Sequence, residues 1–171
     1  MELKKNIIEM ACSRNACTSG IDKLMLASHQ QEFIDLYFSY IDFCLARKVP
    51  SNDFIKKHFG KDLLIANGIY IDKQEISVNN PKRTAVVGES NLTLNFDDYA
   101  VGRVYVADNS TATINAGRNA FVVMDCVDKS KLTVNIYENA KVIVNAYAGA
   151  KVSGNGTIIR KNTPTYVLNG I

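Results

Sequence analysis

The sequence lacks the features that most quickly assign a protein to a membrane, an export route or a metal. No stretch approaches the run of about eighteen apolar residues that a membrane-spanning helix needs. Glu9 interrupts the only apolar run near the N-terminus, so we expect neither a signal peptide nor a lipid anchor on Cys12. The four cysteines share no metal-ligand spacing. We therefore expect reduced thiols in a cytoplasmic protein with no membrane partner.

Histidine and one-sided charge are also scarce. His29 is expected inside a helix and His58 near the end of another, and neither belongs to a recognisable metal motif, so we expect no metal and no cofactor. The net charge of +3 and a pI of about 8.6 are too weak a basic bias to favour nucleic acid, which calls for clustered lysine and arginine. We regard a nucleic-acid partner as the less favoured hypothesis.

What the sequence does contain is a repeat. Residues 90–159 form seven ten-residue units without a gap. The first position of each unit is small and alternates between serine and alanine until Ala150, and the third, fifth and seventh positions are mostly apolar, with Gly102 and Ala112 as weak positions. Apolar residues with a period of two predict half-buried strands.

The sixth position of the units is asparagine five times, at residues 95, 115, 135, 145 and 155. Strands stacked in register allow identical amides to bond as a ladder, which explains a fixed asparagine column better than turn chemistry does. The serine and alanine alternation, together with a hydroxyl residue recurring every twenty positions from Thr93 to Ser153, indicates that two units form one coil.

These columns resemble the parallel β-helix, or β-solenoid, superfamily over residues 85–160, without pointing to a specific family. The resemblance implies a short parallel β-helix over these residues, and the alternation gives its coils about 20 residues. With the N-terminal helical segment and hairpin that residues 1–80 predict, we expect an α+β chain. The alternative is an antiparallel β-sandwich or meander, since short strands at this spacing are also typical of that fold. A hexapeptide solenoid needs a six-residue period and fits poorly.

The N-terminal half predicts helices and one hairpin. We expect a short helix over residues 2–12, a long one from Ile21 to Arg47, and a third that begins after Ser51 and closes at Gly60. Asn67-Gly68 predicts a tight hairpin between residues 63 and 71. With a break at Pro81, the chain divides into a helical cap segment with the hairpin (1–80) and the solenoid with a C-terminal tail (81–171).

Two groups of charged residues are candidate sites. Lys131, Lys141 and Lys151 share one column and could contact an anion or an acidic partner; with two units per coil, Lys131 and Lys151 should lie one above the other. The turn carboxylates Asp97, Asp98 and Asp108 could serve a sugar-cleaving site, but aspartate is common in turns for conformational reasons.

The helical segment also offers candidates. A helix-turn-helix around residues 48–51 would carry only Lys56 and Lys57 as nearby basic residues, so DNA binding is less favoured. The long helix has apolar residues on more than one face, which predicts an exposed association face and a homo-oligomer. That face comprises Phe33, Tyr37, Phe38, Tyr40 and Ile41.

The leading hypothesis is therefore a non-enzymatic protein-interaction or structural module that uses a rigid solenoid surface together with a helical cap or association element. No catalytic residues are assigned. The alternatives are a carbohydrate-active or acyl-transfer enzyme on a β-helix, and a nucleic-acid-binding protein.

Overall fold

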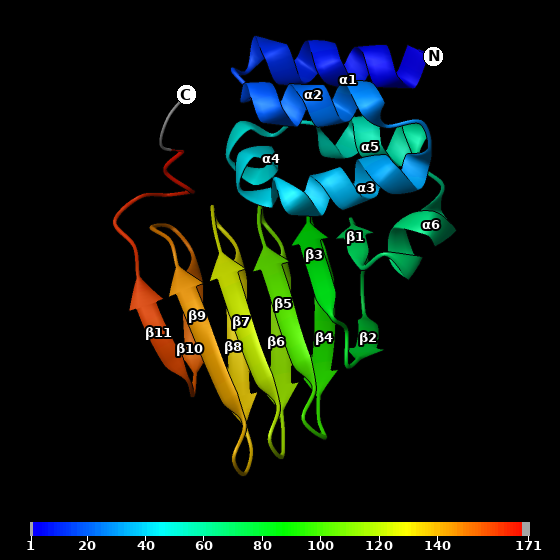
Figure 1. Cartoon of the computed structure of the whole chain (residues 1–171). Coiled ribbons are helices and arrows are strands. Elements are labelled where there is room, and N and C mark those ends of the chain that lie inside the picture. The colour runs from blue at the N-terminus through cyan, green and yellow to red at the C-terminus, as the bar shows by residue number, and fades with distance from the viewer. Residues whose placement is uncertain (1, 169–171) are drawn as a thin grey trace. The chain divides into compact units, whose positions relative to one another are not determined.

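The computed structural model describes residues 2–168, which form six helices followed by eleven strands (Figure 1). They fall into two compact units, one containing the chain up to Leu64 with the described residues from Tyr166 onward, and the other spanning Ile65–Thr165. The helices are α1 Glu2–Ser13, α2 Thr18–Leu26, α3 Gln30–Ser39, α4 Ile41–Arg47, α5 Asn52–His58 and α6 Lys61–Ala66. No helix among residues 2–168 is long and apolar enough to span a membrane.

The prediction of one long helix from Ile21 to Arg47 is wrong, because the segment forms α2, α3 and α4. Ala27 has an extended backbone after α2, and His29 begins α3 as its N-cap in a capping box with Glu32. A second break occurs at Tyr40, whose backbone is not helical. The predicted helices α1 and α5 are confirmed, and the Ser51 hydroxyl accepts the Phe54 N–H at the start of α5.

The predicted hairpin at residues 63–71 is also wrong. Residues 63–66 belong to α6, and β1 (Ile69–Ile71) pairs in parallel with β3 (Arg83–Val87). Gly68 makes the turn after α6 with φ of +77°, and a Cβ there would lie 2.2 Å from the Arg83 carbonyl oxygen. The segment 65–80, predicted to belong to the helical part, thus contributes strands to the solenoid.

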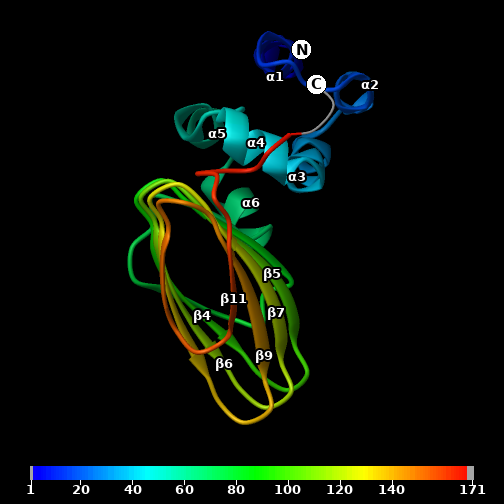
Figure 2. The ribbon, with the colours of Figure 1, turned by 90° about the vertical axis from the view of Figure 1, so that its left-hand side faces the viewer.

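The second unit is a parallel β-solenoid made of two sheets that face each other (Figure 2). Sheet A has the order β1-β3-β5-β7-β9-β11, and sheet B has the order β10-β8-β6-β4-β2. The remaining strands are β2 Ile76–Asn79, β4 Asn91–Phe96, β5 Val101–Val106, β6 Thr111–Ala116, β7 Phe121–Cys126, β8 Lys131–Ile136, β9 Lys141–Ala146, β10 Lys151–Gly154 and β11 Thr157–Arg160.

Pairing links residues one coil apart. In the central coils Leu92 pairs with Ala112, and Val101 with Phe121, twenty residues apart in each case. The first coil is shorter, with Ile69 opposite Ala85, and so is the last, in which Ile143 lies opposite Thr157. The predicted parallel coil of about 20 residues is confirmed, and the antiparallel alternative is excluded.

Alternate side chains of both sheets point inward and form one apolar core. Val134 is buried, as predicted, and Ile136 packs against the core at its margin. Gly102 occupies an inward position because the Phe96 ring fills that space: a Cβ on Gly102 would lie 2.3 Å from Phe96 Cε1. Glycine at this otherwise apolar position of the repeat is therefore explained by its close contact with the Phe96 ring. Ile65 at the end of α6 also packs against this core.

The serine and alanine alternation distinguishes the two kinds of turn. Ser90, Ser110 and Ser130 follow strands of sheet A and are buried. The Ser90 hydroxyl donates to the Val87 carbonyl at 2.8 Å, and that of Ser130 donates to the Val127 carbonyl at 2.6 Å. Alanines occupy the opposite turns. A buried hydroxyl that satisfies turn carbonyls explains why serine recurs only every twenty residues.

Candidate functional site

The outward side chains of the two sheets form two surfaces of different chemistry. We call face A the outward residues of β5, β7, β9 and β11, and face B the outward residues of sheet B. Face A comprises Val101, Arg103, Tyr105, Phe121, Val123, Asp125, Lys141, Ile143, Asn145, Thr157 and Ile159. Face B comprises Ser77, Asn79, Asn91, Thr93, Asn95, Thr111, Thr113, Asn115, Lys131, Thr133, Asn135, Lys151 and Ser153.

Face B is polar throughout, and Asn95, Asn115 and Asn135 form the predicted ladder, whereas Asn155, predicted to continue it, follows the end of β10 and makes no ladder bond with the described residues. Asn95 Nδ2 donates to Asn79 Oδ1, Asn115 Nδ2 donates to Asn95 Oδ1, and Asn135 Nδ2 donates to Asn115 Oδ1, each at 2.9 Å. These amides therefore use much of their hydrogen-bonding capacity on one another. Face B is a polar surface whose amide ladder links successive coils.

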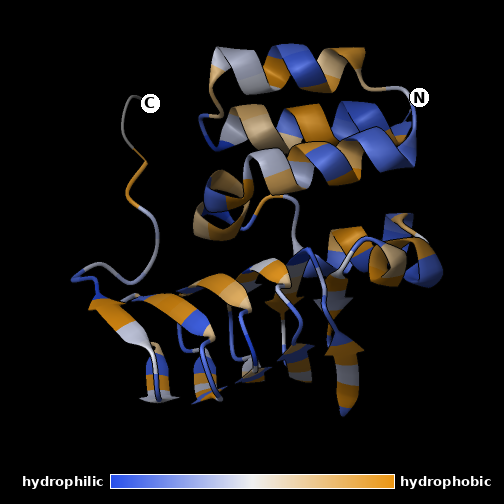
Figure 3. Ribbon diagram, turned by 60° about the horizontal axis from the view of Figure 1, so that its bottom comes forward, coloured by the Kyte–Doolittle hydropathy of each residue, from blue (hydrophilic) through white to orange (hydrophobic). Residues whose placement is uncertain are grey.

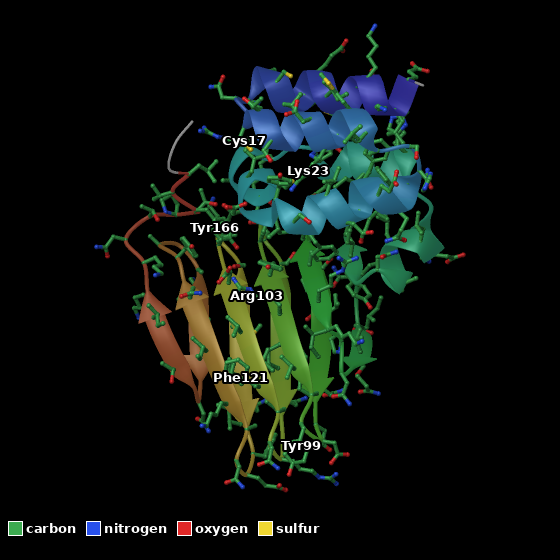
Figure 4. The ribbon with its side chains drawn as sticks, in the orientation of Figure 1. Cys17, Lys23, Tyr99, Arg103, Phe121 and Tyr166 are labelled. Atoms are coloured by element: carbon green, nitrogen blue, oxygen red, sulfur yellow. The ribbon has the colours of Figure 1, made fainter. Side chains whose placement is uncertain are left out.

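Face A displays large apolar side chains to solvent. Val101 is 67% exposed, Phe121 37% and Ile159 42%. Val123 and Ile143 are half-buried in the neighbouring column, where they pair with each other across β7 and β9. Hydrophobic residues recur along the strands in Figure 3, and Figure 4 places Phe121 on β7. An apolar surface shared by successive strands is typical of protein contact sites.

A polar cluster lies beside these apolar residues. Asp125, whose side chain is only 4% exposed, accepts a hydrogen bond from Arg103 Nη2 at 2.9 Å and from Asn145 Nδ2 at 2.7 Å. The Arg103 guanidinium lies 5.3 Å from the centre of the Tyr105 ring. Burial acts to lower the pKa of Arg103, but the neighbouring Asp125 and Tyr105 outweigh it and raise that pKa. Arg103 is therefore a fixed cation with an exposed side on face A (Figure 4).

The predicted lysine group is divided between the faces. Lys131 and Lys151 lie opposite each other in β8 and β10 on face B, as predicted. Lys141 belongs to face A, where it pairs with Phe121. The three lysines therefore do not form one surface. A role of the two stacked lysines in binding an anion or an acidic partner stays a prediction.

The turn carboxylates have structural partners. Asp97 and Asp98 both contact Arg118, and Asp108 Oδ2 accepts the Gly88 N–H at 2.8 Å. Asp98 and Asp97 raise the pKa of Arg118. Asp128 Oδ2 likewise accepts the Asp108 N–H. These contacts explain the turn aspartates as links between successive coils.

The predicted association face of the helices is not an exposed surface. Phe33, Tyr37 and Ile41 are buried, and Phe38 and Tyr40 are half-buried. The error follows from the broken helix: three short helices bury apolar residues that a single long helix would have left on a second face. The premise of an exposed face there is wrong.

The sequence analysis missed Val101, Phe121 and Ile159 because it aligned all seven ten-residue units in a single set, which mixes the outward residues of the two sheets. Once the units are separated into two alternating sets, Val101 and Phe121 stand in one column with Lys141, while Asn91, Thr111, Lys131 and Lys151 stand in the other. That separation was already implied by the serine and alanine alternation and would have revealed the apolar face.

No protein-family model, curated protein or solved structure matches this chain.

Proposed function

We propose that the protein is a non-enzymatic interaction module in which face A binds a second copy of the chain. The observation that carries this proposal is the difference between the two faces: both cover the same core, yet face A exposes Val101, Phe121 and Ile159 while face B is polar throughout. Solvation and sheet pairing account for face B. They give no reason for an exposed phenylalanine beside an exposed valine.

A second copy is the occupant that this surface fits. On face A the carboxylate of Asp125 is buried and compensates the charge of Arg103, so this surface brings little net charge against a second copy beyond that of Lys141. Two such faces related by a two-fold axis bury the apolar residues Val101, Phe121 and Ile159 of each copy. Closed two-fold dimers are the commonest assembly of a single chain. The rigid solenoid holds the face in shape before contact, which lowers the ordering cost of association.

Sedimentation velocity across a dilution series tests the proposal. The parent protein should pass from monomer to dimer with rising concentration. Phe121→Glu should remain monomeric, because it places a charge among the apolar residues that the dimer would bury. Thr111→Glu is the matched control, since Thr111 opens its strand on face B as Phe121 does on face A, and it should dimerise like the parent.

Two outcomes contradict this function. One is a parent protein that stays monomeric at high micromolar concentration. The other is a pair of variants, Phe121→Glu and Thr111→Glu, that weaken dimerisation equally, which would place the contact elsewhere than on face A.

A further inference from the structure

The C-terminal end of the solenoid is an open strand edge. β10 and β11 are the last strands of their sheets, and each pairs on one side only, with β8 and β9 respectively. Their inward side chains Val152 and Ile158 are half-buried, whereas most inward residues of the preceding coil, among them Val134 and Val144, are buried. Unpaired backbone and a partly covered core together mark this end as incomplete.

The backbone direction shows which groups are free. The Lys161 N–H bonds back to the Ala146 carbonyl at 2.8 Å. Because successive residues of a strand point to opposite sides, Arg160 and Ile158 direct their N–H and C=O groups away from β9, toward the free edge. The tail then leaves this line: Ala148 N–H bonds to the Thr163 carbonyl and Asp128 N–H to the Pro164 carbonyl. The described part of the tail, up to residue 168, therefore follows the turns and does not pair with the edge of β11.

The charge of this end is one-sided. Residues 139–168 contain Lys141, Lys151, Arg160 and Lys161 and no aspartate or glutamate. Lys151, Arg160 and Lys161 are exposed, and no salt bridge engages these three among the described residues. The opposite end of the solenoid is different, since residues 72–98 hold five acidic residues against three basic ones.

We infer that the edge of β11 binds an extended, acidic segment of a partner protein, which adds to sheet A as a further strand. Main-chain hydrogen bonds to Ile158 and Arg160 would supply affinity, and acidic side chains facing Arg160 and Lys161 would supply selectivity. An inward apolar residue of the added strand would cover Ile158. This surface differs from the apolar column of face A, and the inference goes beyond the proposed dimer.

Charge selects this occupant over two others. A second copy stacked on the same end would bring its own Lys151, Arg160 and Lys161 against an identical set, and like charges at strand spacing are unfavourable. A nucleic acid would satisfy the cations but leave the backbone donors and acceptors of Ile158 and Arg160 without the regular partners that a peptide strand offers.

Fluorescence anisotropy with three labelled synthetic peptides tests the inference on the full-length protein. The first peptide alternates valine and threonine and ends in two glutamates; the second has lysines in place of the glutamates; the third is the acidic peptide with N-methylated backbone amides. Only the first should bind, and its affinity should fall as salt is raised. Equal binding of the lysine peptide, or of the methylated peptide, overturns the inference.

Protein variants separate the backbone contribution from the charge. Arg160→Ala should weaken binding of the acidic peptide about threefold, as expected for one exposed ion pair. Arg160→Pro should abolish it, because proline also removes the N–H at the free edge while keeping the ladder to β9. Lys82→Glu, an exposed change at the opposite end, should leave binding unchanged. Equal affinities of Arg160→Pro and Arg160→Ala would show that the edge is not used.

Two further outcomes distinguish this surface from others. Phe121→Glu should bind the acidic peptide as the parent does, whether or not it dimerises, so failure of the face A dimer and failure of this inference are separate results. A labelled oligonucleotide that binds more tightly than the acidic peptide, with the same loss in Arg160→Ala, would overturn the inference in favour of a nucleic-acid partner.

Discussion

Faces A and B cover one core but follow different rules. In two of the three columns of face B the same residue type recurs from coil to coil, as in Thr93, Thr113 and Thr133, whereas the column that begins with Asn91 changes. On face A the corresponding column changes from Arg103 to Val123 to Ile143. Repetition on face B is explained by stacking. The lack of repetition on face A points to contacts made outside the chain, and this contrast can be tested by substitutions.

The largest effect should come from the core that both faces share. Val134→Asp places a charge without a partner among inward residues and should lower the free energy of unfolding by roughly 4 kcal/mol or more. Thr133→Asp, its outward neighbour on face B, should change it by less than about 1 kcal/mol. Chemical denaturation followed by circular dichroism measures both. Similar losses in the two variants would mean that the assigned inward and outward sides of β8 are wrong.

A smaller loss of unfolding free energy is expected from Gly102→Ala, which tests how closely the core is packed between the two sheets. The added Cβ would lie 2.3 Å from Phe96 Cε1 and 3.0 Å from the Pro81 carbonyl oxygen. Overpacking of this kind costs about 1–3 kcal/mol. Ala112→Gly, the reverse change at the same position of the next ten-residue unit, on sheet B, serves as a comparison. An unchanged denaturation midpoint for Gly102→Ala would show that the Phe96 ring has room to move.

The amide columns of the two faces allow a direct comparison with one substitution. Asn115 donates one ladder bond and accepts another, whereas Asn145 donates one bond to Asp125. Asn115→Ala removes two bonds between neutral amides and should lower the free energy of unfolding by about 2 kcal/mol, at roughly 1 kcal/mol per bond. Asn145→Ala removes a single bond, but to a carboxylate, and should cost a similar amount, about 1.5–3 kcal/mol. A loss well below about 1 kcal/mol for Asn115→Ala, measured by urea denaturation, would remove the ladder as the distinguishing feature of face B.

The smallest effect concerns thiol reactivity, which reports on the core without changing it. Burial raises the pKa of Cys126 to about 11, and burial together with Asp42 raises the pKa of Cys44 to about 12. A raised pKa keeps the thiol protonated and unreactive at neutral pH. A thiol-reactive disulfide reagent should therefore modify the exposed Cys12 and Cys17 first. Rapid modification of all four cysteines in the native protein would contradict this assignment.

Much of the solenoid was predictable because its physical constraints repeat. The apolar columns and the recurring asparagine required strands in parallel register, and the alternation of Ser110 with Ala120 indicated two strands per coil. The first coil was missed because it spans sixteen positions, from Ile69 to Ala85, and lacks these columns. Asn67-Gly68 suits a hairpin turn locally, and only the long-range pairing of β1 with β3 decides otherwise.

The helical segment was less predictable for a different reason. Neither glycine nor proline marks the breaks at Ala27 and Tyr40, so periodicity continued across them in sequence. The capping pair of His29 and Glu32 was a readable signal for the first break. The second break has no comparable local signal, because the backbone at Tyr40 departs from helical geometry without a helix-breaking residue.

Because the central coils share one register, a whole coil could be removed from this protein without changing how the remaining strands pair. Removing residues 111–130 would delete β6 and β7 together and bring β4 against β8. Asn95 would then pair with Asn135, and Leu94 with Val134, so each residue would keep a partner of the same chemical type. Face B would shorten by one strand spacing of about 4.8 Å and keep its character. Face A would lose Phe121 and Asp125 and leave Arg103 facing Ile143. The number of coils could thus change without altering the chemistry of face B, whereas each coil of face A carries residues that no other coil replaces.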